Sequence, residues 1–497
     1  MFMMKRKLKS MLLVLAVTLC SPPTLAHDFE VDGVYYNITS ADDLTAEVTF
    51  KGNHCDDYSN EYSGSVTIPQ TVTHGDKIYR VERIGDYAFH FCTGLTAIAI
   101  PSSVTSIGEN AFEICASLTS VNLPNSITMI EHGAFSGCSG LTEVTLSHKL
   151  TSIGSCAFYD CKWLTKIDIP NSVMSIGERA FHQCKVLTEI AIPGSVTSVG
   201  VDAFLGTAWY NAQHNGIIYV GKALYKYKGT MPADTSIEVQ EGTSSISPQA
   251  FYGCSGLAYI NIPSSVTSIG YEAFYECSSL ASFTIQNSET SIDWGVFFGT
   301  PWYDNQPNGV VYVGKALYNY KGEMPYGTSV EVREGTVSIS PSAFFNCDRM
   351  ASITFPTSLK SIGDCAFWNC NLMTSITIPS SVTSIGISAF SSCYTLTEVI
   401  SYIPADKLFP IPSNTFELIN LAECVLKVPF GAKATYESTK YWSLFTNIVE
   451  MAEEHGTTGI VLKQITEEPN IVFNLQGRRI TQPAKGVNIV NGKKVMF

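Results

Sequence analysis

Charged side chains are scarce in this chain, since Asp, Glu, Lys and Arg make up only 15% of its 497 residues. The formal net charge of −13 argues against nucleic acid as a partner, because neutralising phosphates needs clustered Lys and Arg. The sequence has no C-x-x-C pair, which argues against a structural zinc site. It also has no H-E-x-x-H, no G-x-S-x-G and no phosphate-binding glycine loop. We therefore expect no catalytic residues, no metal site, no cofactor and no enzymatic activity.

Long apolar runs are also missing beyond the N-terminus, so we expect no transmembrane segment in the mature chain. The N-terminus itself has a basic start at Lys5 to Lys9, an apolar stretch at Met11 to Leu19 and a small-residue cleavage site at Thr24 to Ala26. This pattern predicts a signal peptide over residues 1–26, with His27 as the mature start and a net charge of −17. A lipoprotein attached through Cys20 is the alternative. We expect a secreted or cell-surface protein.

Repetition is what the chain has in abundance. An Ala-Phe pair recurs from Ala88-Phe89 to Ala389-Phe390, mostly at a spacing of 23 residues, and Val296-Phe297 and Thr415-Phe416 are degenerate members of a set of thirteen. A fixed period of about 20 to 50 residues means that a unit cannot bury its apolar face alone and must stack on its neighbours. We predict a mainly β solenoid of about 13 coils with a 23-residue period, short turns or 3-10 segments between strands, and capped ends.

Within each unit the apolar residues keep a constant phase. Leu95 to Ile100 reads L-x-x-I-x-I, the strand of a leucine-rich repeat, and Pro101 ends that strand. Ser103 and its equivalents should satisfy backbone groups of adjacent coils. Gly108 should supply a position with positive φ before the Ala-Phe turn.

These residues carry a family resemblance. The run from Leu95 to Cys115, LTAIAIPSSVTSIGENAFEIC, resembles the consensus of the BspA-like leucine-rich repeat family of bacterial surface proteins, over roughly residues 80–420. The resemblance implies an exported solenoid that binds an extracellular protein, and host matrix proteins are partners of several members. It fixes the architecture far better than the ligand, because a repeated scaffold hosts many specificities.

Ten of the 15 cysteines lie at one phase, four residues after the Ala of the pair. A residue at a constant inward phase behaves as a small buried hydrophobe, and parallel Cβ vectors disfavour a disulfide. We therefore predict a structural ladder of free thiols. Its members are Cys92, Cys115, Cys138, Cys161, Cys184, Cys254, Cys277, Cys347, Cys370 and Cys393.

Two units are interrupted, at 207–241 and 300–335, where the spacing grows to 47 residues. Both inserts read G-[IV]-[IV]-Y-V-G-K-A-L-Y, which favours two short strands joined by a turn, and we expect an enlarged coil with a projecting hairpin. Their aromatic side chains could bind a sugar or a protein, or could cover the enlarged coil. The candidate binding residues are Trp209, Tyr219, Tyr225, Tyr227, Trp302, Tyr312, Tyr318 and Tyr320.

The remaining segments complete the expected organisation. Residues 27–80 form an N-terminal cap, 81–420 the solenoid, 421–451 a C-terminal cap with a helix from Ala432 to about Trp442, and 452–470 a linker. Residues 471–497 read as a small β-module of two hairpins, turning at Gln476-Gly477 and Asn491-Gly492. The strings NLQGRR and GVNIVNGKKV resemble the C-terminal module of type IX secretion substrates, which implies a sorting and attachment role. The alternative is a β-unit packed on the last coil.

The outward strand positions are mostly Thr, Ser and Ala, such as Thr96, Ser120 and Ala191. Such a face can meet a broad protein surface but offers few anchors. We therefore predict an exported cell-surface scaffold for protein recognition or adhesion. The alternatives are carbohydrate binding through the aromatic inserts and a structural surface spacer.

Overall fold

The computed structural model describes residues 27–52, 54–55 and 60–452, together with four short strands between residues 472 and 496. The expected signal peptide and residues 453–470 of the expected linker lie outside the described residues.

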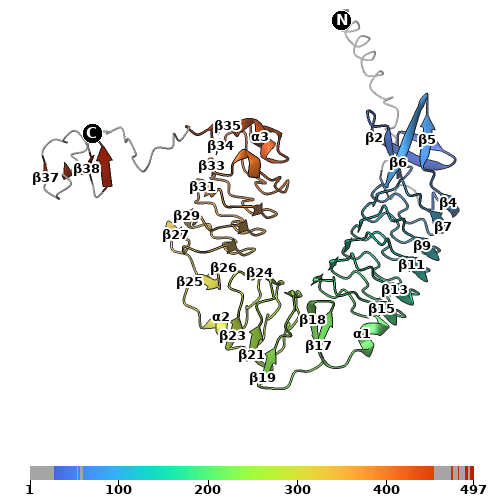
Figure 1. Ribbon diagram of the computed structural model, residues 1–497, viewed down its shortest axis with the longest axis horizontal. Coiled ribbons are helices and arrows are strands. Elements are labelled where there is room, and N and C mark those ends of the chain that lie inside the picture. The colour runs from blue at the N-terminus through green and yellow to red at the C-terminus, as the bar shows by residue number, and fades with distance from the viewer. Residues whose placement is uncertain are drawn as a thin grey trace, which may run out of the picture.

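Residues 60–452 form a stack of three-sided coils that follows a U-shaped path (Figure 1). The first side of each coil is a longer strand, and in Figure 1 these strands lie along the outer rim of the U. They are β4 (Gly64–Thr67), β7 (Leu95–Ala99), β9 (Ser120–Asn122), β11 (Glu143–Thr145), β13 (Lys166–Asp168), β15 (Glu189–Ala191), β19 (Thr235–Glu238), β21 (Leu257–Ile262), β23 (Ser282–Ile285), β27 (Thr328–Glu331), β29 (Met350–Thr354), β31 (Ser375–Ile378), β33 (Glu398–Ser401), β34 (Val425–Val428) and β35 (Asn447–Glu450).

The second side carries, in most coils, a two-residue strand, usually the Ser-Ile pair of the repeat. Successive Ile residues stand in parallel register, as Ile107 does with Ile130. These strands are β6 (Lys77–Ile84), β8 (Ser106–Ile107), β10 (Met129–Ile130), β12 (Ser152–Ile153), β14 (Ser175–Ile176), β16 (Ser198–Val199), β18 (Ala223–Lys228), β20 (Ser245–Ile246), β22 (Ser268–Ile269), β24 (Ser291–Ile292), β26 (Ala316–Lys321), β28 (Ser338–Ile339), β30 (Ser361–Ile362) and β32 (Ser384–Ile385). Of these, β6, β18 and β26 are longer than the others.

The third side is the Ala-Phe turn, and backbone hydrogen bonds join the turns of adjacent coils. The N–H of Phe89 donates to the carbonyl of Ala111 at 2.7 Å, and the rings of Phe89 and Phe112 stack with centroids 4.9 Å apart. The positive φ lies on the residue before the Ala and on the residue three after it, such as Asn110 and Ile114. Our expectation of a positive φ at Gly108 was wrong.

Gly108 is instead required by close stacking. A Cβ on Gly108 would lie 2.6 Å from the backbone nitrogen of Asp86 in the preceding coil. The serine prediction is confirmed in several coils: Ser195 Oγ donates to the carbonyl of Val173 at 2.8 Å, and Ser381 Oγ to that of Leu359 at 2.7 Å. It is wrong for Ser103 itself, whose buried Oγ has no hydrogen-bond partner among the described residues.

The predicted mainly β solenoid with a period of about 23 residues is confirmed, but it has about 16 turns rather than 13. Each insert adds a turn, because β18 pairs with β20 on the short-strand side and β19 pairs with β21 on the long-strand side. The same holds for β26 with β28 and β27 with β29.

The expected projecting hairpin is therefore wrong, because its second strand is a rung of the stack. The first strand, β17 (Gly216–Val220) or β25 (Gly309–Val313), folds back antiparallel on β18 or β26 and begins a new sheet. A short helix precedes it, α1 (Ala208–Ala212) or α2 (Pro301–Asp304).

The inserts also divide the apolar interior into three clusters. In chain order, Tyr225 belongs to the first cluster and the adjacent Leu224 to the second. In the same way, Tyr318 belongs to the second cluster and the adjacent Leu317 to the third. In Figure 1 the two inserts lie where the base of the U meets its arms.

Both ends of the stack are covered in part. At the N-terminal end β1 (Phe29–Val31), β2 (Val34–Ser40) and β3 (Thr45–Thr49) extend the short-strand sheet beyond β6, and β5 (Thr71–His74) pairs with β6. Near the C-terminal end lie η1 (Ala405–Lys407), α3 (Lys433–Ser438) and η2 (Trp442–Leu444). The expected helix to Trp442 was too long, because α3 ends at Ser438 and Tyr441 adopts a φ of 68°.

The last four strands form one antiparallel sheet. β36 (Val472–Phe473) pairs with β37 (Arg479–Ile480) and with β38 (Val487–Val490), and β38 pairs with β39 (Lys493–Met496). The expected turns at Gln476-Gly477 and Asn491-Gly492 lie outside the described residues.

Candidate binding surfaces

Each insert opens with a helix whose first turn is capped by the threonine that replaces a ladder cysteine. Thr207 Oγ1 accepts a hydrogen bond from the N–H of Tyr210 at 3.0 Å and donates to the carbonyl of Phe204 at 2.8 Å. Thr300 makes the same two bonds, at 3.2 Å to Tyr303 and 2.6 Å to Phe297. A hydroxyl does both because it donates and accepts well, whereas a thiol is a weak partner.

A lysine closes the other end of each helix. Lys228 Nζ donates to the carbonyls of Tyr210, Asn211 and Gln213 at 3.0, 2.8 and 2.6 Å. A cation at a helix C-terminus satisfies carbonyls that have no partner within the helix.

Lys321 repeats this arrangement on the carbonyls of Tyr303, Asp304 and Gln306 at 2.9, 2.6 and 2.7 Å. Our sequence analysis did not single out either lysine. The recurrence of Tyr-Lys-Gly at both inserts was the available signal.

Two of the candidate aromatic residues are core residues. Tyr225 and Tyr318 are each 1% exposed, and their hydroxyls accept hydrogen bonds from the N–H groups of Phe204 and Phe297 at 3.1 and 2.9 Å. Burial raises the pKa of both phenols. Their proposed role in ligand contact is therefore corrected, because a ligand cannot reach these rings.

The other six candidates are half-buried and packed against the stack. Trp209 lies against Phe204 and Trp302 against Phe297, with ring centroids 5.1 and 5.0 Å apart. Tyr227 packs on Phe251 with centroids 6.2 Å apart. Tyr320 packs on Phe344 in the same way, also with centroids 6.2 Å apart.

The remaining pair, Tyr219 and Tyr312, accept hydrogen bonds from the N–H groups of Gln240 and Arg333 at 3.1 and 3.0 Å. The guanidinium of Arg333 also lies over the Tyr312 ring, 4.2 Å from its centroid. The aromatic side chains of each insert gather around its own coil. This arrangement favours a role in packing the coil and argues against a sugar-binding surface.

The exposed surface lies instead on the long-strand side. Thr, Ser, Glu, Lys and Asp side chains point outward from β9, β11, β13 and β15, as at Ser120, Glu143, Lys166 and Glu189. Parallel pairing on this side is interrupted, because β9 pairs with β11 and β13 with β15, whereas β11 and β13 belong to different sheets. The short-strand sheet runs without a break past the same coils.

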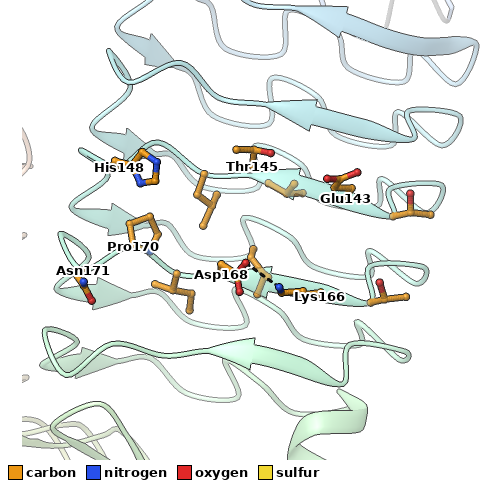
Figure 2. A pocket seen from close by; sticks show the side chains of 13 residues that line it. Glu143, Thr145, His148, Lys166, Asp168, Pro170 and Asn171 are labelled. Carbon is orange, nitrogen blue, oxygen red and sulfur yellow. Dashed lines mark ion pairs between the residues drawn. The ribbon is translucent and has the colours of Figure 1, made fainter.

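A groove of about 720 Å³ lies at this interruption (Figure 2). Glu143 and Thr145 line it from β11, Lys166 and Asp168 from β13, and His148 and Asn171 from the turns that follow. Lys166 and Asp168 form an exposed ion pair at 3.1 Å. The groove therefore offers both charges together with neutral hydrogen-bonding groups.

The ten ladder cysteines lie on the inner side of the turns as free thiols. Cys115 Sγ donates to the carbonyl of Phe89 at 3.1 Å and Cys138 Sγ to that of Phe112 at 3.0 Å, so each thiol joins two coils. Burial raises the pKa of Cys92 and of Cys277 to about 12. Cys254 and Cys347, each following an insert, are half-buried.

Among the described residues, no three His, Cys, Asp or Glu side chains converge as a metal site would require. None of the helices in this described part combines the length and apolar character needed to cross a bilayer.

Stacked coils with a strand, a short connecting side and an inward apolar set define a leucine-rich repeat solenoid. Residues 82–211, 218–320 and 318–432 match the BspA type leucine rich repeat region in six copies. The chain therefore belongs to the BspA-type leucine-rich repeat family.

Three solved structures illustrate this likeness. A leucine-rich repeat protein from Bacteroides ovatus is 27% identical over 86% of this chain and 100% of its own, with a TM-score of 0.33. A leucine rich cell surface protein from Faecalibacterium prausnitzii is 25% identical over 83% of this chain and 97% of its own, with a TM-score of 0.31. The pneumococcal vaccine antigen PcpA is 16% identical over 86% and 99%, with a TM-score of 0.26. No curated protein matches the chain.

Proposed function

We propose that this protein is an exported, surface-associated scaffold that recognises an extracellular protein through its outer long-strand face. The observation that carries the proposal is the groove between β11 and β13, where Glu143, Lys166, Asp168 and His148 gather beside a break in strand pairing. Mixed charge and small neighbouring side chains suit a polar protein surface. Recognition of this kind requires no catalytic residue.

The chain would reach the surface by export followed by attachment. Residues 1–26 would be removed as a signal peptide, and the C-terminal sheet of β36 to β39 would serve sorting or attachment, as its resemblance to type IX secretion modules implies. N-terminal sequencing of the secreted chain tests the first step. Surface display of the full chain, compared with a chain that ends at residue 470, tests the second.

The binding test uses the whole mature chain, residues 27–497, against a panel of host matrix proteins. Thr145→Arg introduces a long charged side chain into the groove, and Met174→Arg is the matched control because Met174 is exposed outside the groove lining. We expect at least about tenfold weaker binding for Thr145→Arg and no change for Met174→Arg. Equal binding by both variants would show that the groove is not the recognition site. Failure to bind any protein of the panel would favour a structural spacer.

A further inference from the structure

The N-terminal cap covers only one side of the first coil. On the short-strand side, β3 adds a parallel rung to β6. On the long-strand side the series ends at β4, which pairs with β7 alone among the described strands. The opposite edge of β4 faces the turn between β1 and β2 across a groove of about 580 Å³.

Two peptide groups of β4 point into this groove. The N–H of Ile68 donates to the carbonyl of Ala99 at 3.0 Å, so Val66 and Ile68 face β7. Because successive residues of a strand present their peptide groups to opposite edges, Ser65 and Thr67 face the groove. Such an edge is a template for another extended chain. β4 itself contains neither Lys nor Pro, the register shift of its pairing with β7 lies at its start between Gly64 and Ser65, and Pro69 lines the groove just after its end.

The walls of the groove are fixed and partly apolar. Tyr36 and Tyr62 are buried, and Val66 is half-buried beside them. The Tyr62 hydroxyl donates to the carbonyl of Thr49 at 2.7 Å and accepts from the N–H of Tyr35 at 3.1 Å, which holds this wall in place.

The charge of the groove is of one sign. Its lining holds two carboxylates, Asp32 and Glu61, and no basic residue. Asp32 is exposed in the turn between β1 and β2, with a φ of 50°. Glu61 is half-buried and already accepts a hydrogen bond from the N–H of Lys51 at 3.0 Å. A basic side chain would complement both carboxylates.

We propose that this groove binds an extended peptide segment of a partner protein, which adds a strand to β4 and places a Lys or Arg against Asp32 and Glu61. Main-chain bonds to Ser65 and Thr67 supply affinity, while the acidic rim selects the side chains. The partner class rests on the proposed protein-recognition function, but the groove between β11 and β13 is a separate surface.

The test is selection of a displayed library of random 12-residue peptides on the whole mature chain, followed by affinity measurement with the selected peptides. Thr67→Pro removes the N–H that faces the groove without touching the bonds to β7, whereas Thr67→Val keeps that N–H and loses only the hydroxyl. We expect about tenfold or greater loss of affinity for Thr67→Pro and little change for Thr67→Val. Selected peptides should carry Lys or Arg, and bound peptide should slow hydrogen exchange at Ser65 and Thr67.

Two further variants test the contribution of the groove's carboxylates to binding. Asp32→Asn keeps a residue that tolerates the left-handed backbone and should weaken binding several-fold, whereas Glu30→Gln, outside the groove lining, should not. Absence of any selected peptide, or equal binding by Thr67→Pro with unchanged hydrogen exchange, would overturn the proposal. Thr145→Arg, in the groove between β11 and β13, should leave peptide binding intact. Loss of matrix-protein binding at that groove can therefore be distinguished from loss of peptide binding at the groove beside β4.

Discussion

The hydroxyl of Tyr225 accepts a hydrogen bond from the N–H of Phe204 at 3.1 Å, in the place where a regular coil supplies an alanine carbonyl. In the coil before, the N–H of Phe181 donates to the carbonyl of Ala203 at 2.8 Å. The bonded ladder resumes beyond the insert, where the N–H of Tyr227 donates to the carbonyl of Ala250 at 2.8 Å. A single side chain thus bridges the point at which the repeat is interrupted.

Tyr225→Phe should therefore destabilise the protein by about 1 to 3 kcal/mol, because it leaves the buried Phe204 N–H without a partner while preserving the ring. Urea unfolding followed by far-UV circular dichroism measures the change, and hydrogen exchange at the Phe204 amide localises it. Tyr227→Phe is the matched control, since its half-buried ring packs on Phe251 and its backbone carries the ladder bond. Equal effects from both substitutions would show that the Tyr225 hydroxyl has no special role.

Lys228→Met should loosen the first insert. The substitution keeps most of the aliphatic stem but removes the ammonium that bonds three carbonyls at the end of α1, so we expect a loss of about 1 to 3 kcal/mol. The exposed Lys222, in the turn between β17 and β18, is the control for removing one positive charge, and Lys222→Met should change the unfolding free energy by less than about 0.5 kcal/mol. Thermal unfolding of both variants at one pH measures the loss of stability of each.

The repeat could be predicted because each coil restates the same inward set, and the Ala-Phe pair fixes the phase of every neighbour. The role of the inserts could not be predicted, because Ala223-Leu224 stands where most other coils have Ser-Ile, and no Ala-Phe pair follows it. The Tyr225 hydroxyl reaches a backbone group 21 residues earlier, a contact that depends on how β17 displaces the coil. The local sequence pattern does not encode that displacement.

The outer groove was equally hidden from the sequence. The period is intact at Ala134, Ala157 and Ala180, on either side of the interruption between β11 and β13. Strand pairing is broken between β11 and β13 on the long-strand side, while the short-strand sheet stays bonded past the same coils. The break depends on how neighbouring coils meet, and the sequence of a single coil does not encode it.

Gly108→Ala tests the close stacking that replaced our expectation of a positive φ. The new Cβ would lie 2.6 Å from the nitrogen of Asp86, which forces adjacent coils apart, and we expect a loss of about 1 to 3 kcal/mol. Gly194→Ala is the matched control, because a Cβ there meets nothing within 4 Å, and it should be neutral or slightly stabilising. Similar unfolding midpoints for both variants would contradict the packing argument.

The buried thiols predict a loss of stability at alkaline pH. Burial raises the pKa of Cys92 and Cys277 from 9.0 to about 12, so between these values the unfolded chain releases protons that the folded chain retains. The contribution of these thiols to stability is therefore complete below pH 9.0 and is lost progressively as the pH rises towards about 12. Cys277→Ala should flatten that decline in urea titrations between pH 8.5 and 10.5, whereas Cys156→Ala, at a half-buried turn position, should flatten it less. An unchanged slope for Cys277→Ala would mean that its thiol ionises alike in both states.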